Sequence, residues 1–434
     1  MRIAKPYDAC MMRMSFEKRR RLECLDSEAL AHHQLGKLNW LLESILPQNQ
    51  FYKEMLGGIE LPLKSLDELS RYSFTFKDEL IGNSETGDVA ANLTFPIDNY
   101  VRFHRTSGTR GRPLVLLDTE DDWQWWIECW QFVLDVAEID ETDRVMMAFS
   151  FGPFIGFWSA NDAVVARGSL VIPGGGLSTL ARLELVRTAK VTALLCTPSY
   201  ALHMAEIAAE NQIDIRSSSV GKIVVAGEPG GSVASIRQRI EEAWNARVVD
   251  HSGATEVGAW GYANPDGTGL YVNESEFIAE FLSVESGETA GEGELSELVL
   301  TTLGRVGCPV IRYRTGDLVR PTWNSEGPCR FVLLEGGILS RSDDMMVIRG
   351  VNVFPSSVEQ ILRSFPEVVE YRITVQKEGE MDALLIEIED HLNDSERVAK
   401  EFQLRLGLKV QVTTVPTATL PRFEGKGKRF VDKR

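Results

Sequence analysis

The sequence lacks several patterns that would assign it to a specialised class of protein. Its 434 residues include six cysteines, none in a Cys-x-x-Cys pair, so neither a zinc ribbon nor a disulfide framework is indicated. No apolar run reaches the roughly 18 residues of a membrane span. The first eight residues, MRIAKPYD, have no apolar stretch of the secretory kind. We therefore expect reduced thiols, a cytoplasmic location and no membrane partner.

Basic residues are also fewer than acidic residues. The chain has 46 Lys and Arg residues against 63 Asp and Glu, a formal net charge of −17, so we expect no nucleic-acid partner. The basic run Lys18–Arg21 is predicted to be a solvated helix face, with an anion patch as the alternative. A hydrophobic content of 44% and a charged content of 25% are typical of a globular protein. The length predicts a large domain and a smaller one.

The order of apolar runs predicts the fold class. Residues 1–90 are predicted to be helical, with a Leu- and Pro-rich connection near Leu61–Leu63. Between about 144 and 250, short β-branched runs alternate with helix-length stretches, which indicates βαβ units and a buried parallel sheet. After 275 the runs are longer and closer together, which indicates antiparallel pairing or a barrel-like subdomain. The chain is therefore predicted to be α/β, with a large N-terminal domain over 1–341 and a small, mobile α+β domain over 342–434.

A tryptophan-rich segment precedes the parallel region. Trp123, Trp126 and Trp130 are spaced three and four apart, which places them on one face of a helix. An aromatic cage is conceivable, but core packing of an amphipathic helix is the preferred interpretation.

Small and hydroxyl-bearing residues follow the predicted parallel strands. In open parallel sheets, ligands bind where the strands end, so these loops are candidate binding segments. They comprise 173–176, 197–199, 227–230 and 252–255.

A further loop, Arg105–Pro113, combines hydroxyls, glycines and cations in nine residues. Glycines let a backbone approach phosphate closely, and hydroxyl, N–H and guanidinium groups donate to its oxygens. The order is not that of a Walker A loop. The loop therefore suits a polyphosphate, with an ordinary surface turn as the alternative.

Other segments point to the same chemistry. Asp250–Glu256 follows a strand and ends in a carboxylate suited to Mg²⁺. Arg312–Asp317 ends in an aspartate that could accept hydrogen bonds from ribose hydroxyls. Arg341–Asp344 and Arg349–Pro355 span the predicted domain boundary, and Gly425–Arg429 forms a basic tail able to bring a cation into a site.

In this order and spacing, these segments resemble the acyl- and aryl-adenylating superfamily, which includes acyl-CoA synthetases and the adenylation domains of peptide synthetases. The chain is most similar to the phenylacetate–CoA ligases. Three features point there: the Arg349–Pro355 run, the strand end Cys196–Tyr200 and the short N-terminal helical region. The likeness covers nearly the whole chain.

The resemblance implies roles for individual residues. Lys426 would be the catalytic lysine, with Lys428 a weaker candidate. Thr255 and Glu256 would serve the phosphate and Mg²⁺, and Asp343 would be the hinge. The implied ATP-binding residues are Thr106, Ser107, Gly108, Thr109, Arg110, Gly111, Arg112, Gly227, Glu228, Pro229, Ser252, Gly253, Asp317 and Arg341.

The implied reaction has two steps. A carboxylate attacks the α-phosphate of ATP to give an acyl-adenylate, and the enzyme supplies cations because charge builds on the phosphate oxygens. A thiol then attacks the adenylate after the small domain rotates. Coenzyme A is the expected acceptor, with carrier-protein phosphopantetheine as the alternative. The sequence leaves a homodimer open.

The acyl pocket is expected to be aromatic, formed by Phe151, Phe154, Trp158, Tyr200 and Gly258. Such a wall favours a flat aromatic or heteroaromatic acid, although the rings could equally pack a helix against the sheet. We therefore expect a small-molecule aromatic carboxylic acid as the substrate.

Three positions depart from the family pattern. Arg110 and Arg112 replace a hydroxyl residue and a lysine, and Ser252 replaces a tyrosine that would stack on adenine. A non-catalytic nucleotide- or acyl-binding relative is therefore an alternative. Some relatives carry a zinc site after the Thr-Glu motif, but 263–271 here contains neither Cys nor His, so we expect no zinc.

Overall fold

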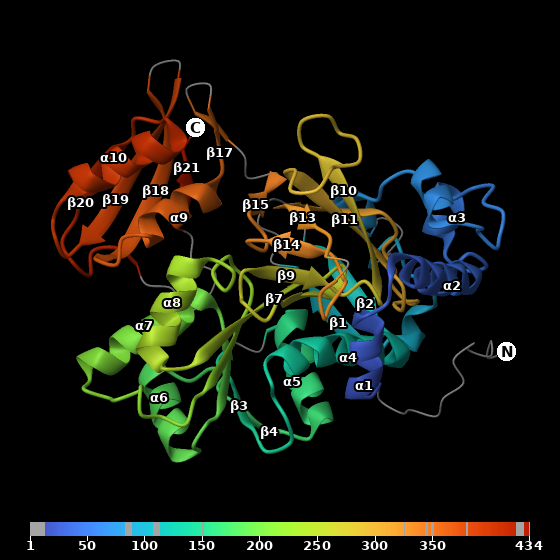
Figure 1. The fold of residues 1–434 in the computed structure, drawn as a ribbon, viewed down its shortest axis with the longest axis horizontal. Coiled ribbons are helices and arrows are strands. Elements are labelled where there is room, and N and C mark those ends of the chain that lie inside the picture. Colours follow the sequence, from blue (N-terminus) through green and yellow to red (C-terminus); the bar gives the residue numbers. More distant parts are fainter. Residues whose placement is uncertain are drawn as a thin grey trace.

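The computed structural model describes residues 14–82, 89–106, 113–149, 152–324, 326–342, 346–348, 351–378, 381–421 and 429–433 (Figure 1). Its N-terminal helices are α1 (Phe16–Glu23), α2 (Ser27–Ile45) and α3 (Gln50–Met55). Ser15, Asp26 and Asn49 cap these helices by accepting backbone N–H groups.

The prediction of a helical N-terminal region was wrong beyond α3. From there to residue 82 the described chain has only 3₁₀ turns, because Gly57, Gly58 and Pro62 interrupt the helical pattern. The prediction that the basic run Lys18–Arg21 is a solvated helix face was wrong for Arg19. This residue is only 3% exposed, and its Nε lies 2.5 Å from Asp135 Oδ2.

The largest sheet has nine strands in the described residues, in the order β13-β14-β9-β8-β7-β6-β5-β3-β4. The parallel strands are β3 (Arg144–Met147), β4 (Leu170–Pro173), β5 (Ala193–Cys196), β6 (Lys222–Val225) and β7 (Arg247–Ala254). The antiparallel continuation is β8 (Gly258–Ala263), β9 (Gly269–Val272), β14 (Leu333–Glu335) and β13 (Pro321–Thr322).

Helices cover both faces of the parallel strands, as the βαβ pattern predicts (Figure 1). Successive strand residues point to opposite faces. Val145 and Met147 of β3 therefore belong to the core beneath α4 and α5, whereas Met146 belongs to the core beneath the other helices. The helices are α4 (Glu120–Val136), α5 (Ile155–Arg167), α6 (Thr179–Thr188), α7 (Pro198–Glu210) and α8 (Ala234–Trp244).

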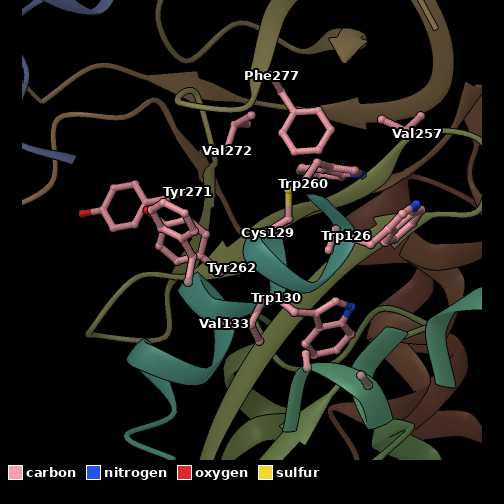
Figure 2. Close-up of a cluster of buried hydrophobic side chains, with 14 of the residues drawn as sticks. Trp126, Cys129, Trp130, Val133, Val257, Trp260, Tyr262, Tyr271, Val272 and Phe277 are labelled. Atoms are coloured by element: carbon pink, nitrogen blue, oxygen red, sulfur yellow. The ribbon is translucent and has the colours of Figure 1, made fainter. Parts of the chain in front are cut away.

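The tryptophan-rich segment forms α4 and packs in the core, which confirms the preferred interpretation. Figure 2 shows Trp126 and Trp130 among side chains of β8, β9 and β10, including Trp260, Tyr262 and Phe277. Trp126 and Trp130 are 2% and 3% exposed.

A second, antiparallel sheet stands where the barrel-like subdomain was expected. Its four strands, in the order β10-β11-β12-β15, are β10 (Phe277–Ser283), β11 (Ser296–Thr302), β12 (Tyr313–Val319) and β15 (Ser340–Arg341). A separate hairpin pairs β1 (Arg102–Arg105) with β2 (Val115–Asp118).

The C-terminal region has its own hydrophobic core, formed by residues from Met346 to Val410. Its elements match the predicted α+β order, with the additional strands β17 and β21. They are β16 (Met346–Ile348), β17 (Val351–Val353), α9 (Pro355–Arg363), β18 (Val368–Glu378), β19 (Met381–Asp390), α10 (Ser395–Leu406), β20 (Gln411–Thr414) and β21 (Phe430–Asp432). The other cores use residues up to Leu334. The boundary between 341 and 342 stays a prediction.

In the described part of the chain, no helix is both long enough and apolar enough to cross a bilayer. The cysteines described there, at 24, 129, 196, 308 and 329, are all free thiols.

Candidate active site

The strand order reverses direction near one edge of the large sheet. Strand β4 lies on one side of β3, and β5 lies on the other side. The chain leaves β3 for α5 on one face and leaves β5 for α7 on the opposite face. Ligands of open α/β sheets bind at such a switch point, beyond the carboxyl ends of the strands.

The predicted phosphate loop connects β1 to β2. Its base is closed by two hydrogen bonds between the residues that flank it: Thr106 N donates to the Leu114 carbonyl at 2.9 Å, and Leu114 N donates to Thr106 Oγ1 at 3.0 Å. Arg105 N donates to the Pro153 carbonyl at 2.8 Å, which joins the hairpin to the loop before α5. The base of the predicted phosphate loop is therefore adjacent to the segment expected to bind the acid.

Thr255 and Glu256 occupy a tight turn between β7 and β8. The register of the two strands shifts between Ser252 and Ala254, so a bulge precedes this turn. Glu256 is 8% exposed, and its Oε1 accepts a hydrogen bond from the Tyr313 hydroxyl at 2.8 Å. Lys77 Nζ lies 3.4 Å from the same oxygen. A buried carboxylate is thus fixed at the end of β7.

The environment keeps this carboxylate ionised. Burial by itself would raise the pKa of Glu256, but the Lys77 ammonium, a backbone N–H and the Tyr313 hydroxyl together hold that pKa below its ordinary value. Conversely, burial and the Glu256 charge raise the pKa of Tyr313, so its phenol remains a hydrogen-bond donor.

Asp317 and Arg341 face each other on β12 and β15. Arg341 Nη1 donates to Asp317 Oδ1 at 2.8 Å, and Asp317 is 6% exposed. Gly316 has φ = 75°, and a Cβ there would lie 2.9 Å from Arg341 Nη2, so glycine permits the guanidinium to approach. The charges of Asp317 and Arg341 both influence the pKa of Tyr313, and the Tyr313 hydroxyl donates to Glu256. The pair therefore lies near Glu256.

Two residues that hold this turn were missed by the sequence reasoning. Arg305 Nη1 donates to the carbonyls of Thr255 and Glu256 at 3.1 and 3.0 Å. Its Nε donates to Asp118 Oδ1 at 2.8 Å. Neither residue stands in a motif, and the two are 187 positions apart, so the chain pattern offers no signal for this pair.

The predicted adenine-pocket residues lie on neighbouring strand ends. Gly227 follows β6 with φ = 91°, and Glu228 Oε1 accepts a hydrogen bond from Ser199 N at 2.7 Å. Pro229 is exposed next to them. On β7, Ser252 is 8% exposed and Gly253 is exposed. These positions share the edge of β6 and β7, which are adjacent parallel strands.

The expected acyl-pocket residues divide into exposed and buried groups. Phe154 and Trp158, at the start of α5, are 39% and 40% exposed. Tyr200 is 1% exposed, and its hydroxyl lies 3.2 Å from Thr179 Oγ1. A Cβ on Gly258 would lie 2.8 Å from the Phe277 ring. The structure thus brings Phe154 and Trp158 to the switch point, whereas Tyr200 and Gly258 are buried beside it.

Several predicted residues lie outside the described residues. They are Ser107, Gly108, Thr109, Arg110, Gly111, Arg112, Phe151, Asp343, Lys426 and Lys428. Their roles stay predictions.

In the described residues, no group of three or more His, Cys, Asp or Glu side chains is arranged to hold a metal ion. Mg²⁺ in nucleotide sites requires only one or two carboxylates, because the substrate phosphates complete its coordination. Glu256, a single buried carboxylate whose pKa is held low, fits a magnesium site of this kind.

A cleft lies between the large domain and the small C-terminal domain. Ser199, His203 and Glu206 of α7 and Arg239 of α8 form one wall. Residues of α9, β18 and the chain before β21 form the other, and α9 lies beside α8 in Figure 1. The second wall contains Arg363, Val368, Val369, Glu370, Tyr371 and Arg429. The small domain therefore faces the start of α7 across this cleft, next to the loop that carries Glu228.

Comparisons with known proteins agree with this arrangement. The family model for the AMP-binding enzyme C-terminal domain matches residues 350–434. A phenylacetate–coenzyme A ligase of Pseudomonas putida is 30% identical over 433 residues, which cover 95% of this chain and 96% of that protein.

Solved structures resemble the whole chain. A crystal structure of 2-hydroxyisobutyryl-CoA ligase in the postadenylation state, in complex with R3-HIB-AMP, matches with a TM-score of 0.89 and 25% identity over 100% of this chain and 94% of that one. The same enzyme with 2-HIB-AMP and CoA in the thioesterification state gives a TM-score of 0.72, at 26% identity over 96% and 93% of the two chains.

The two-part fold and the relatives together show an adenylate-forming enzyme, an AMP-forming acid–CoA ligase. Within that class, the chain belongs to the phenylacetate–CoA ligase family. The resemblance drawn from the sequence motifs is thereby confirmed.

Proposed function

We propose that this enzyme activates a small aromatic carboxylic acid with ATP and transfers the acyl group to coenzyme A. The observation that supports this most directly is the ionised Glu256 carboxylate, held by Tyr313 and Lys77 beside the Asp317–Arg341 pair. Exposed Phe154 and Trp158 at the switch point favour an aromatic acid over a short aliphatic one. The phenylacetate ligases among the relatives support the same substrate class.

In this proposal the residues of the large domain bind the nucleotide. The loop over 106–112 binds the β- and γ-phosphates, and the Asp317 carboxylate accepts hydrogen bonds from the ribose hydroxyls. Gly227, Glu228, Pro229, Ser252 and Gly253 line the adenine pocket. Mg²⁺, when bound at Glu256, would neutralise charge on the departing pyrophosphate. Thr255 donates its hydroxyl to a phosphate oxygen.

Lys426 is proposed to bridge the acid carboxylate and the α-phosphate during the first half-reaction. Positive charge there stabilises the transition state, in which negative charge spreads over the phosphate oxygens. Hinge motion at Asp343 would then remove the lysine and admit CoA. The structure is more similar to the postadenylation form of 2-hydroxyisobutyryl-CoA ligase than to its thioesterification form, which supports two arrangements of the small domain.

Carrier-protein phosphopantetheine is the second candidate acceptor, with the same first half-reaction. A cytoplasmic location and a homodimer accompany the proposal as expectations from the sequence.

ATP–pyrophosphate exchange tests the first half-reaction. Wild-type protein is incubated with labelled pyrophosphate, ATP, Mg²⁺ and single carboxylic acids, aromatic and aliphatic, without a thiol. Exchange with an aromatic acid, followed by thioester formation when CoA is added, is the expected result. Exchange only with aliphatic acids would overturn the substrate class, and no exchange from folded protein would favour the non-catalytic alternative.

The role of Lys426 has a separate test. Lys426→Ala should abolish exchange but spare thioester formation from supplied acyl-adenylate and CoA. The control is Lys409→Ala, at an exposed lysine of the same domain, which should retain both activities. An equal loss of both half-reactions in Lys426→Ala would contradict the role.

A further inference from the structure

Two buried glutamates of the small domain stand opposite each other. Glu370 on β18 and Glu389 on β19 are register partners in the antiparallel pair. They are 3% and 0% exposed. Like charges directly opposite each other repel, and an unpaired buried carboxylate is costly. Each carboxylate therefore needs a strong partner of its own.

Glu370 has such a partner in Arg429. Arg429 Nε lies 2.6 Å from Glu370 Oε1, and Arg429 Nη2 lies 3.0 Å from Glu370 Oε2. The Arg429 carbonyl accepts a hydrogen bond from Ile373 N at 2.7 Å, and its guanidinium lies over the Tyr371 ring. Backbone and side chain together attach Arg429 to β18, and a bidentate charged pair is among the strongest of such contacts.

Glu389 accepts hydrogen bonds from the backbone of a turn. Its Oε1 accepts a hydrogen bond from Leu420 N at 2.6 Å, and its Oε2 accepts one from Ala418 N at 3.0 Å. Ala418 has φ = 64°, in the left-handed region that disfavours a side chain. Leu420 is 3% exposed. The carboxylate thus holds a turn whose conformation is unfavourable without it.

The two anchored points enclose the segment that carries Lys426. Leu420 precedes this lysine by six positions, and Arg429 follows it by three. Both anchors meet at one cross-strand pair of a single hairpin. Fixing both ends of a segment to one rigid element removes much of the entropy that would otherwise be lost when its side chain is positioned.

We propose that Glu370 and Glu389 are positioning residues for the first half-reaction, acting through the ends of the Lys426 segment. This inference rests on the proposed function of Lys426. Glu370, Tyr371 and Arg429 also line the cleft opposite α7 of the large domain. The anchor at Arg429 therefore lies on the face that meets the large domain when the adenylate is formed.

The same hairpin provides a matched control. Arg372 and Glu387 are also register partners on β18 and β19, with a bidentate pair of the same kind: Nε to Oε2 at 2.6 Å and Nη2 to Oε1 at 2.8 Å. The Arg372 side chain is 41% exposed, and Glu387 binds neither end of the lysine segment. Glu387→Gln therefore changes an equivalent pair on the same strands without changing the proposed anchor.

The experiment compares Glu370→Gln, Glu389→Gln and Glu387→Gln in the full-length chain, with phenylacetate as the acid. Both anchor variants should lower the rate of pyrophosphate exchange by about tenfold or more, the rate effect of losing one strong contact in the transition state. Thioester formation from supplied phenylacetyl-adenylate and CoA should stay near the wild-type rate. Glu387→Gln should retain both rates.

A second readout does not depend on activity. Trypsin cleaves after Lys426 and Lys428, and we expect cleavage there to be about fivefold faster or more in Glu370→Gln than in Glu387→Gln, since Glu370→Gln weakens the attachment of Arg429 to β18. Equal cleavage in these two variants, or equal loss of both half-reactions in the anchor variants, would overturn the positioning role. A wild-type chain that gives no exchange would instead contradict the proposed function, and the cleavage comparison would still decide the anchor.

Discussion

Arg305 and Asp118 form an ion pair in which both side chains are 0% exposed, with Nη2 2.7 Å from Oδ1. Asp118 ends the hairpin that carries the predicted phosphate loop, and Arg305 also binds the carbonyls before and at Glu256. The pair therefore links the β1–β2 hairpin to the turn that carries Glu256 through the core.

Arg305→Met should destabilise the protein by about 3–5 kcal/mol, because it leaves the Asp118 carboxylate buried without its cation. Urea denaturation measures the loss. Arg187→Ala is the control, since Arg187 and Glu184 form an exposed pair on α6 and its removal should cause no measurable change. Equal stabilities of the two variants would show that the buried pair contributes nothing.

Lys77→Met should shift the acidic limb of the pH profile of pyrophosphate exchange to higher pH. The Lys77 ammonium lowers the pKa of Glu256, so its removal raises that pKa and the carboxylate becomes protonated at a higher pH. The reference variant is Lys64→Met, at an exposed lysine. If the two profiles coincide, Glu256 ionisation does not control the acidic limb.

Phe154→Ala and Trp158→Ala should each raise the KM for an aromatic acid by roughly tenfold, corresponding to about 1.4 kcal/mol of lost ring contact. The KM for a short aliphatic acid should fall or stay constant. Initial rates of adenylate formation measure both values. Phe16→Ala removes another exposed ring, on α1, and should leave both KM values unchanged. Parallel changes for both acids would argue against an aromatic acyl pocket.

Asp250 makes the stability of the protein depend on pH in an unusual direction. Burial raises its pKa from 3.8 to about 6, although Ser232 and the His251 N–H donate to it. A carboxyl with a raised pKa in the folded state binds its proton more tightly there than in the unfolded chain. Its contribution to stability is therefore greatest below about pH 4 and is lost as the pH rises to about 6, by about 3 kcal/mol.

Urea denaturation of wild-type protein and Asp250→Asn between pH 4 and 7 checks this dependence. The difference in the free energy of unfolding between the two proteins should change with pH in this window and become constant above it. A pH-independent difference would show that Asp250 titrates at its ordinary value.

Local patterns in the sequence determined most of the secondary structure. The βαβ region between about 144 and 250 and the α+β character of the small domain were predicted correctly, because buried parallel strands and amphipathic helices have distinct apolar periods. The site motifs were found for a related reason. Phosphate, ribose and metal each require particular groups on a short segment, so Thr106, Thr255–Glu256 and Asp317 stand in recognisable local patterns.

Only the tertiary structure decided which distant residues meet. Lys77 and Tyr313 converge on Glu256 from opposite parts of the chain, and Arg305 reaches Asp118 across the core. It also buried Arg19, which the basic run predicted to be solvated, because Asp135 of α4 lies opposite. The periodicity of a sequence shows which face of a helix or strand is apolar. Whether a charged side chain is buried depends instead on an oppositely charged partner, which only folding brings near. The motifs therefore specified the chemistry of this site, and the packing of distant elements specified its electrostatics.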